Sequence, residues 1–282
     1  MRIFQSPSDI SIFLSSERVL GKKIGFVPTM GALHEGHLAL INSSKLANHI
    51  TVCSIFVNPT QFNNKEDLAK YPRPIDADRQ KLEEANCDVL FIPSENQMYD
   101  ELPRLKFDFG DLETVMEGQF RPGHFNGVGI VVAKLFNIVQ PDISYFGQKD
   151  YQQFLVISTL VKDLSFQIQL VCHPTIREKD GLALSSRNLR LRFEERAIAP
   201  LIYKCLQSAI SDFKKGISIE RIKEQVSEEI NSHAGFKLEY IEFADANTLS
   251  LLEGYVKNKK VVICLAAFLG TVRLIDNVIV EI

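Results

Sequence analysis

The sequence has no excess of charge of either sign. Its 282 residues include 32 basic and 35 acidic side chains, which gives a net charge of −3. General nucleic-acid binders usually carry a basic excess, so we expect no nucleic-acid partner. The hydrophobic fraction of 45 % and the charged fraction of 24 % are close to the averages of globular proteins. We therefore expect a folded chain with a substantial core rather than a disordered one.

Long hydrophobic runs and clustered cysteines are also missing. The longest apolar run, about Val261 to Leu269, is roughly half of a membrane span. Met1 to Asp9 lacks the charged and apolar blocks of a signal peptide. The five cysteines form no Cys-x-x-Cys motif, and an odd, unclustered number suits a reducing compartment. We expect all five to be buried, reduced core residues in a cytoplasmic protein without membrane contact.

Short apolar runs alternate with amphipathic stretches over the first 170 or so residues. This alternation predicts a parallel sheet with helices on both faces. Such sheets bind ligands at the carboxyl ends of their strands. The expected strands are 24–28, 51–57, 89–92, 143–146 and 167–172, and the expected helices are 34–47, 75–85, 128–139 and 151–164.

The pattern changes after Pro174. A polar loop is expected over 177–191, followed by helices over about 193–213 and 218–232 and by strands over 238–243, 260–267 and 271–280. The sequence thus predicts an α/β protein with a Rossmann-like N-terminal domain, residues 1–174, and a smaller α+β C-terminal domain, residues 175–282. We expect the loop at the boundary to act as a hinge.

A His-x-Gly-His tetrad lies where the first of these strands leads into a helix. His34 and His37 are three residues apart, so both side chains face the same side of the first turn. The N-terminus of a helix offers unpaired N–H groups to a phosphate. This arrangement is the signature of class I nucleotidyltransferases. The alternatives are two surface histidines on an ordinary helix or a metal site, but a third metal ligand at suitable spacing is missing.

Three further polar segments follow predicted strands or lie in the hinge. Asn58 and Gln61 follow the second strand, and their amides can hold a hydroxy acid without adding charge. The segment 146–153 contains Lys149, which can neutralise phosphate, and Asp150, which can cap a helix or bind ribose. The segment 177–188 contains two serines followed by Arg187, an arrangement that can bind polyphosphate. Each segment alone also fits an ordinary turn, cap or surface loop.

A glycine-rich stretch, residues 117–127, precedes the apolar helix and carries Arg121 and His124. A loop of this kind can cover an active site. Together with the four segments above, it resembles the pantothenate synthetase (pantoate–β-alanine ligase) family. The resemblance runs from Phe26 to Asn188, and the C-terminal third is far less diagnostic.

The resemblance implies a two-step reaction. ATP and pantoate would give pantoyl adenylate and diphosphate, and the amine of β-alanine would then displace AMP to form pantothenate. It also implies a homodimer, Mg²⁺ as the companion of ATP, and a C-terminal domain that acts as a lid. Asp78 falls where the family places a magnesium carboxylate, but Ala77 stands where family members often have a second acid, and Asp76 lies one residue further back.

Site residues follow from the same resemblance. His37, His34, Lys149 and Arg187 would be catalytic, with His37 at the position usually assigned as the proton donor. Gln61 and Gln153 would bind pantoate, with Gln61 close to β-alanine as well. ATP would be bound by Met30, Gly31, Ala32, Leu33, His34, Glu35, Gly36, His37, Gly147, Gln148, Lys149, Asp150, Ile176, Leu184, Ser185, Ser186 and Arg187.

Two other functions are considered. An adenylyltransferase of the same superfamily with a different small acceptor would release diphosphate but never AMP. A regulatory module would bind the nucleotide without chemistry, but it would not need a complete set of groups around the leaving diphosphate.

Overall fold

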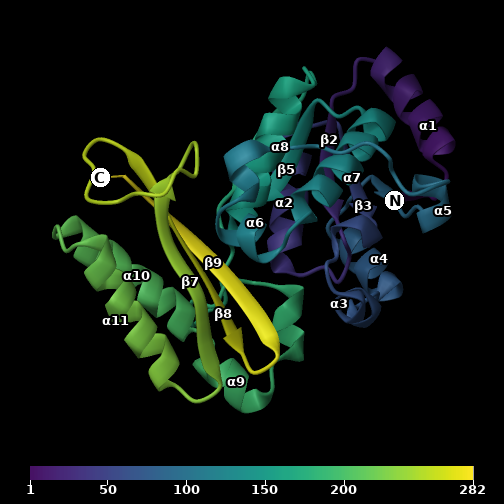
Figure 1. Cartoon of the computed structure of the whole chain (residues 1–282). Coiled ribbons are helices and arrows are strands. Elements are labelled where there is room, and N and C mark those ends of the chain that lie inside the picture. The colour runs from purple at the N-terminus through teal and green to yellow at the C-terminus, as the bar shows by residue number, and fades with distance from the viewer. Residues whose placement is uncertain (282) are drawn as a thin grey trace.

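The computed structural model describes residues 1–281 and, within that range, all side chains except that of Lys65. Two sheets organise these residues (Figure 1). The first is parallel and contains β1 (Arg2–Phe4), β2 (Ile24–Thr29), β3 (Ile50–Ile55), β4 (Val89–Phe91), β5 (Ile143–Gly147) and β6 (Gln169–His173). The second is antiparallel and contains β7 (Phe236–Asp245), β8 (Lys260–Leu269) and β9 (Val272–Glu281).

The parallel sheet has the strand order β1-β4-β3-β2-β5-β6. From β2 the chain proceeds in one direction through β3 and β4, and then returns to add β5 and β6 on the other side of β2. The order therefore reverses between β2 and β5. In open α/β sheets this is the place where ligands bind, beyond the carboxyl ends of the two strands. The predicted Rossmann-like arrangement is confirmed.

Helices cover both faces of this sheet. The longer ones are α1 (Pro7–Val19), α2 (Glu35–Ala47), α4 (Ile75–Glu84), α7 (His124–Val139) and α8 (Tyr151–Asp163), and the shorter ones are η1 (Pro59–Gln61), α3 (Lys65–Lys70), α5 (Glu95–Met98), η2 (Gly110–Glu113), α6 (Met116–Phe120) and η3 (Gln148–Asp150). Successive strand residues point to opposite faces. Phe26 accordingly packs with α1, α7 and α8, whereas Val27 packs with α2 and α4.

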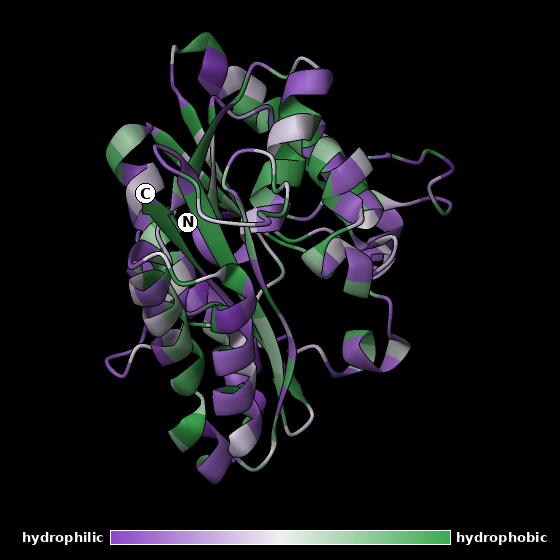
Figure 2. Ribbon diagram, turned by 60° about the vertical axis from the view of Figure 1, so that its left-hand side comes forward, coloured by the Kyte–Doolittle hydropathy of each residue, from purple (hydrophilic) through white to green (hydrophobic). Residues whose placement is uncertain are grey.

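The small sheet is buried on both faces. Its helices are η4 (Ser186–Arg190), α9 (Phe193–Ile198), α10 (Leu201–Lys214) and α11 (Ile219–Ser232). In β8, Val261, Ile263 and Leu265 pack into the same core as α10 and α11. The alternate residues Val262 and Cys264 pack in a cluster that includes residues of α6 and α8 from the other domain. This double burial explains why β8 is an unbroken apolar run, and Figure 2 shows the central strands as hydrophobic.

The structure corrects several sequence-based predictions. The helix expected over 193–213 is two helices, α9 and α10, separated at Pro200, which has no N–H to continue the hydrogen-bond ladder. The buried helix α7 begins at His124, four residues before the predicted start. β1, α1 and the short helices α3, α5 and α6 were not predicted. Cys172 is partly exposed, although the other four cysteines are buried as expected.

No helix within residues 1–281 is long and apolar enough to cross a membrane.

Candidate active site

A cleft lies beyond the carboxyl ends of β2 and β5 and extends along the seam between the two domains. Most of the predicted ATP and pantoate residues line it. These are Met30, His34, Gly36, His37, Gln61, Gly147, Lys149, Asp150, Gln153, Ile176, Leu184, Ser185, Ser186 and Arg187. Gly31, Ala32, Leu33, Glu35, Gln148 and Asp78 are not among the lining residues. Residues up to 157 positions apart in the sequence, Met30 and Arg187, thus face the same cleft.

The turn from β2 into α2 is held by hydrogen bonds to the carboxylate of Asp78. Gly31 has a φ of 84°, a left-handed conformation that favours glycine, and Ala32 follows with a φ of 49°. The backbone N–H groups of Ala32 and Leu33 donate to the two carboxylate oxygens of Asp78, each at 2.7 Å. Asp78 is fully buried. Its carboxylate therefore fixes the strained turn that presents His34 to the cleft.

The two histidines of the tetrad cap α2 through their rings. The Nδ1 of His34 accepts from the N–H of Gly36 at 3.2 Å, and the Nδ1 of His37 accepts from the N–H of His34 at 3.3 Å. The ring centroids are 4.1 Å apart. A Cβ at position 36 would lie 2.9 Å from the His34 ring, so this contact requires glycine. With both Nδ1 atoms accepting, the neutral rings carry their protons on Nε2 and can donate them to a ligand.

Burial keeps both rings neutral. Burial, with a smaller contribution from Lys149, lowers the pKa of His34 to about 4. Burial likewise lowers the pKa of His37 to about 3, with contributions from His34 and Lys149. At neutral pH the pair therefore supplies two hydrogen-bond donors without net charge, and the positive charge in this part of the cleft comes from Lys149.

The Gln61 side chain is oriented by its neighbours. Its Oε1 accepts from Nδ2 of Asn58 at 3.2 Å, and its backbone carbonyl is 2.8 Å from Nδ1 of His124. Asn58 is buried, and its Oδ1 accepts from the hydroxyl of Tyr99 at 2.9 Å. Both residues line the cleft, as the sequence suggested, and Asn58 also positions the side chain of Gln61. Burial lowers the pKa of His124 to about 4, so this buried ring is also neutral.

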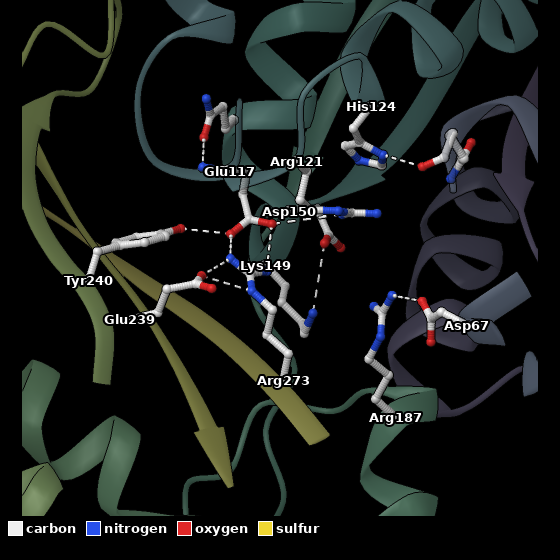
Figure 3. A network of polar contacts seen from close by, with 12 residues as sticks. Asp67, Glu117, Arg121, His124, Lys149, Asp150, Arg187, Glu239, Tyr240 and Arg273 are labelled. Carbon is white, nitrogen blue, oxygen red and sulfur yellow. Dashed lines mark hydrogen bonds and ion pairs between the residues drawn. The ribbon is translucent and has the colours of Figure 1, made fainter. Parts of the chain in front are cut away.

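Arg187 lies on the opposite side of the cleft, in η4. Its guanidinium is 3.4 Å from a carboxylate oxygen of Asp67 in α3 (Figure 3). Arg190 is 2.9 Å from the other oxygen of the same carboxylate. The N–H of Arg187 donates to Oγ of Ser185 at 3.2 Å. The preceding hairpin is also held, because Arg196 pairs with Glu178 at 2.6 Å and with Asp180 at 2.7 Å. The expected loop at the domain boundary is therefore an ordered hairpin followed by a short helix.

A buried ion-pair network at the seam was not predicted. Glu117 of α6 is 9 % exposed, and both of its oxygens accept from Arg273 of β9, at 2.7 and 2.8 Å. The hydroxyl of Tyr240 donates to the same carboxylate at 2.8 Å, and Glu239 is a second partner of Arg273 (Figure 3). Burial alone would raise the pKa of Glu117, but Arg273 brings it to about 2. The two domains are thus joined through a charged, fully hydrogen-bonded contact.

The buried carboxylates near the cleft already have partners. Both oxygens of Asp78 are used by the turn beneath the tetrad, and Glu117 is paired with Arg273. Asp276 is likewise paired with Arg177. Across residues 1–281, no three His, Cys, Asp or Glu side chains are arranged so that they could hold a metal ion. Asp78 fits a structural role better than the metal-ligand role that the resemblance implied.

Known proteins resemble this chain over its whole length. The family model described as Pantoate-beta-alanine ligase matches residues 2–279. The pantothenate synthetase of Azobacteroides pseudotrichonymphae is 46 % identical over 279 residues, which cover 99 % of each chain. The crystal structure of pantothenate synthetase from Thermus thermophilus is 41 % identical, with a TM-score of 0.90 and 99 % of each chain covered.

A third similar protein has been solved with ligands. It is the pantoate-beta-alanine ligase from Francisella tularensis, complexed with beta-gamma ATP and β-alanine. The identity is 39 % and the TM-score is 0.83, with 99 % of this chain and 97 % of that chain covered.

Proposed function

The chain belongs to the Pantoate-beta-alanine ligase family, and on that premise we propose that its cleft joins pantoate to β-alanine in two steps, through pantoyl adenylate. The protein is an ATP-dependent ligase. The observation that carries the proposal is the convergence of His34, His37, Lys149 and Arg187 with Gln61 and Gln153 on one cleft at the point where the strand order reverses.

In the first step, a carboxylate oxygen of pantoate attacks the α-phosphorus of ATP. A P–O bond forms, the bond to the β-phosphate oxygen breaks, and diphosphate leaves. Because two anions must meet, positioning and neutralisation of charge carry most of the catalysis. The Nε2–H groups of His34 and His37 donate to the phosphates, while Lys149 and Arg187 neutralise the charge that grows on diphosphate. His37 acts as a neutral hydrogen-bond donor in this scheme, since its pKa of about 3 disfavours the imidazolium form at neutral pH.

In the second step, the amine of β-alanine attacks the acyl carbonyl of pantoyl adenylate. The C–N bond forms, the bond between the acyl carbon and the phosphate oxygen breaks, and AMP leaves while the amine loses a proton. Gln61 and Gln153 bind the pantoyl group while the amine attacks. The fixed orientation of Gln61 by Asn58 and His124 supports its role in keeping the carbonyl in place for the amine.

We further propose a role for the metal ion and for the C-terminal domain, and an assembly and location for the enzyme. ATP brings Mg²⁺ with mostly phosphate and water ligands, as this ion often prefers, so no step is assigned to the ion. The C-terminal domain, which we place from residue 175 onward, closes over the cleft and limits hydrolysis of the adenylate. The enzyme works in the cytoplasm as a homodimer on small-molecule substrates, without nucleic acid or membrane as a partner.

Closure can be tested with trypsin. Arg187 and Arg190 lie in η4 beside the cleft, and Arg190 is exposed. Cleavage after these residues should be slower with ATP and pantoate present than without them. Equal rates in the two conditions would contradict the closing movement.

Exchange of labelled diphosphate into ATP tests the two-step reaction. We expect exchange with pantoate alone, because the first step is reversible and needs no amine. Exchange that required β-alanine would rule out an independent adenylate. Among the alternatives, an adenylyltransferase with another acceptor would show exchange with that acceptor in place of pantoate, and a module that only binds the nucleotide would show none.

A further inference from the structure

The side-chain amide of Asn277 joins the C-terminal domain to the turn that carries Lys149. Asn277 lies in β9, which packs against both η3 and η4. Its Nδ2 donates to the carbonyl oxygens of Gln148 and Lys149, each at 2.9 Å. Its Oδ1 in turn accepts from Nε2 of Gln148 at 3.2 Å. Three hydrogen bonds therefore join one residue of the second domain to the short turn that carries Lys149.

This amide is buried and firmly held. Asn277 is 3 % exposed, so water cannot replace its partners easily. Its own N–H donates to Oδ1 of Asp276 at 2.8 Å. Asp276 is also buried and forms a two-point ion pair with Arg177, at 2.5 and 2.9 Å. Because Arg177 directly follows Ile176 in the cleft wall, the same part of β9 is anchored on two sides of the site.

We propose that Asn277 is a positioning residue for the adenylation step, which it serves by fixing the backbone of the Gln148–Lys149 turn and so aiming the ammonium of Lys149 into the cleft. The side chain of Lys149 is 15 % exposed and has Asp150 at 3.7 Å as its ion-pair partner. That contact is too long to fix the ammonium in one place. The orientation of Lys149 therefore depends on its backbone, and the backbone is held by the other domain.

A consequence is that the position of the C-terminal domain and the geometry of the phosphate site are coupled. A shift of β9 away from η3 would break the bonds to both carbonyl groups at once. A movement of about 1 Å at a catalytic group can lower a rate on the order of 10²-fold. The inference rests on the proposed role of Lys149 in the reaction, and the experiment below separates the two.

The first test is Asn277→Ala, which removes all three side-chain bonds. We expect pantoate-dependent diphosphate exchange to fall on the order of 10–100-fold. Aminolysis of preformed pantoyl adenylate by β-alanine should change less than threefold, because diphosphate has already left. A matched control is Asn231→Ala. It removes a side-chain oxygen that accepts a hydrogen bond from the N–H of Leu238, at 2.9 Å, inside the same domain. Its exchange rate should stay within about twofold of the unmodified chain.

The decisive test is a double-mutant cycle with Lys149. If Asn277 acts through Lys149, Asn277→Ala should have almost no further effect in a Lys149→Ala background. Independent, multiplicative losses would overturn the inference and assign Asn277 a general structural role. A near-normal exchange rate for Lys149→Ala alone would instead contradict the proposed function of Lys149. Should Asn277→Ala fail to fold, Asn277→Ser keeps a small polar side chain and enters the same cycle, with the same outcomes deciding.

Discussion

The two domains contribute to the cleft in different ways. The N-terminal domain supplies His34, His37, Gln61 and Lys149, which face the cleft from the ends of its parallel strands. The C-terminal domain supplies Arg273, whose charged partner Glu117 belongs to the N-terminal domain. The C-terminal domain also brings Arg187 to the cleft, so it contributes one proposed catalytic group of its own and, through Arg273 and Asn277, holds parts of the N-terminal domain in place. A site at such a seam therefore depends on contacts between the domains as well as on the groups that face the ligand.

The largest effect should follow from breaking the buried ion pair at the seam. Arg273→Met leaves the carboxylate of Glu117 buried, with the hydroxyl of Tyr240 as a close donor and Arg121 at 3.8 Å. Removing one member of a buried pair typically costs about 3–5 kcal/mol in the free energy of unfolding. Urea denaturation measures this loss. A Glu117→Gln/Arg273→Met double variant should recover part of it, since the buried carboxylate of Glu117 is then gone and only Glu239 and Arg121 lose a charged partner.

A control for this prediction is the exposed pair of Arg221 and Glu224, at 3.0 Å. Arg221→Met should lower the free energy of unfolding by less than about 1 kcal/mol. Equal losses for Arg273→Met and Arg221→Met would show that the contact between the domains contributes no more than a surface pair.

The next effect in size concerns a group of the N-terminal domain. His37→Ala should lower turnover on the order of 10²–10³-fold, because it removes one preorganised donor to the phosphates. Its melting temperature should remain close to that of the unmodified chain. His233→Ala serves as the control, because His233 does not line the cleft. Near-normal turnover of His37→Ala would refute the assignment of this residue.

The pH dependence of stability should reveal the neutral histidines. Burial lowers the pKa of His124 to about 4, whereas an unfolded histidine titrates near 6.5. In this pH range His124 binds a proton in the unfolded state but not in the folded state. The free energy of unfolding should therefore fall as the pH decreases from about 6.5 to 4. Each such group contributes about 1.4 kcal/mol per pH unit in this window. The acid group Glu117 titrates lower, at about 2.

The measurement is the free energy of unfolding at pH 7 and pH 5 for the unmodified chain and for His124→Gln. In the variant, the decrease in the free energy of unfolding per pH unit should be smaller by about the contribution of one histidine, about 1.4 kcal/mol per pH unit. An unchanged slope in His124→Gln would mean that this ring is protonated in the folded protein.

The smallest effect concerns Asp67, which pairs with Arg187 in the structure and should therefore compete with ATP for this guanidinium. Asp67→Asn removes the charge that holds Arg187 and Arg190 in the free protein. A partly exposed pair of this kind is worth about 0.2–1 kcal/mol, so the KM for ATP should decrease by up to about fivefold. Steady-state kinetics with pantoate and β-alanine at saturation test this. An increase in KM would show that Asp67 supports ATP binding instead.

The sequence predicted the N-terminal domain better than the contacts between the domains. Strand–helix alternation and the tetrad at His34–His37 are local patterns, so they identified the sheet, and the family resemblance supplied most of the residues that line the cleft. The residues that hold the site were missed because their partners are distant in the chain. Glu117 and Arg273 are 156 positions apart, and Asn277 lies 128 positions from Lys149. A charge in a sequence does not show which opposite charge will be buried beside it.

Distance along the chain also explains why Asp78 was predicted to be a metal ligand. Its position in the sequence matched a metal carboxylate of the family, whereas its two hydrogen bonds to the turn at Ala32 and Leu33 become visible only in three dimensions. The helix break at Pro200 could have been predicted from the proline alone. β1 and α1 were missed because both are short or weakly amphipathic, and their burial depends on the neighbouring strand β4 and helix α7.

Release of AMP from ATP, measured with pantoate and β-alanine added separately and together, shows directly whether the cleft carries out the ligase reaction. We expect AMP and pantothenate to appear only when both substrates are present. Diphosphate without AMP, whatever the acceptor, would contradict it, and the assignments of Gln61 and Gln153 to pantoate would then have to be abandoned.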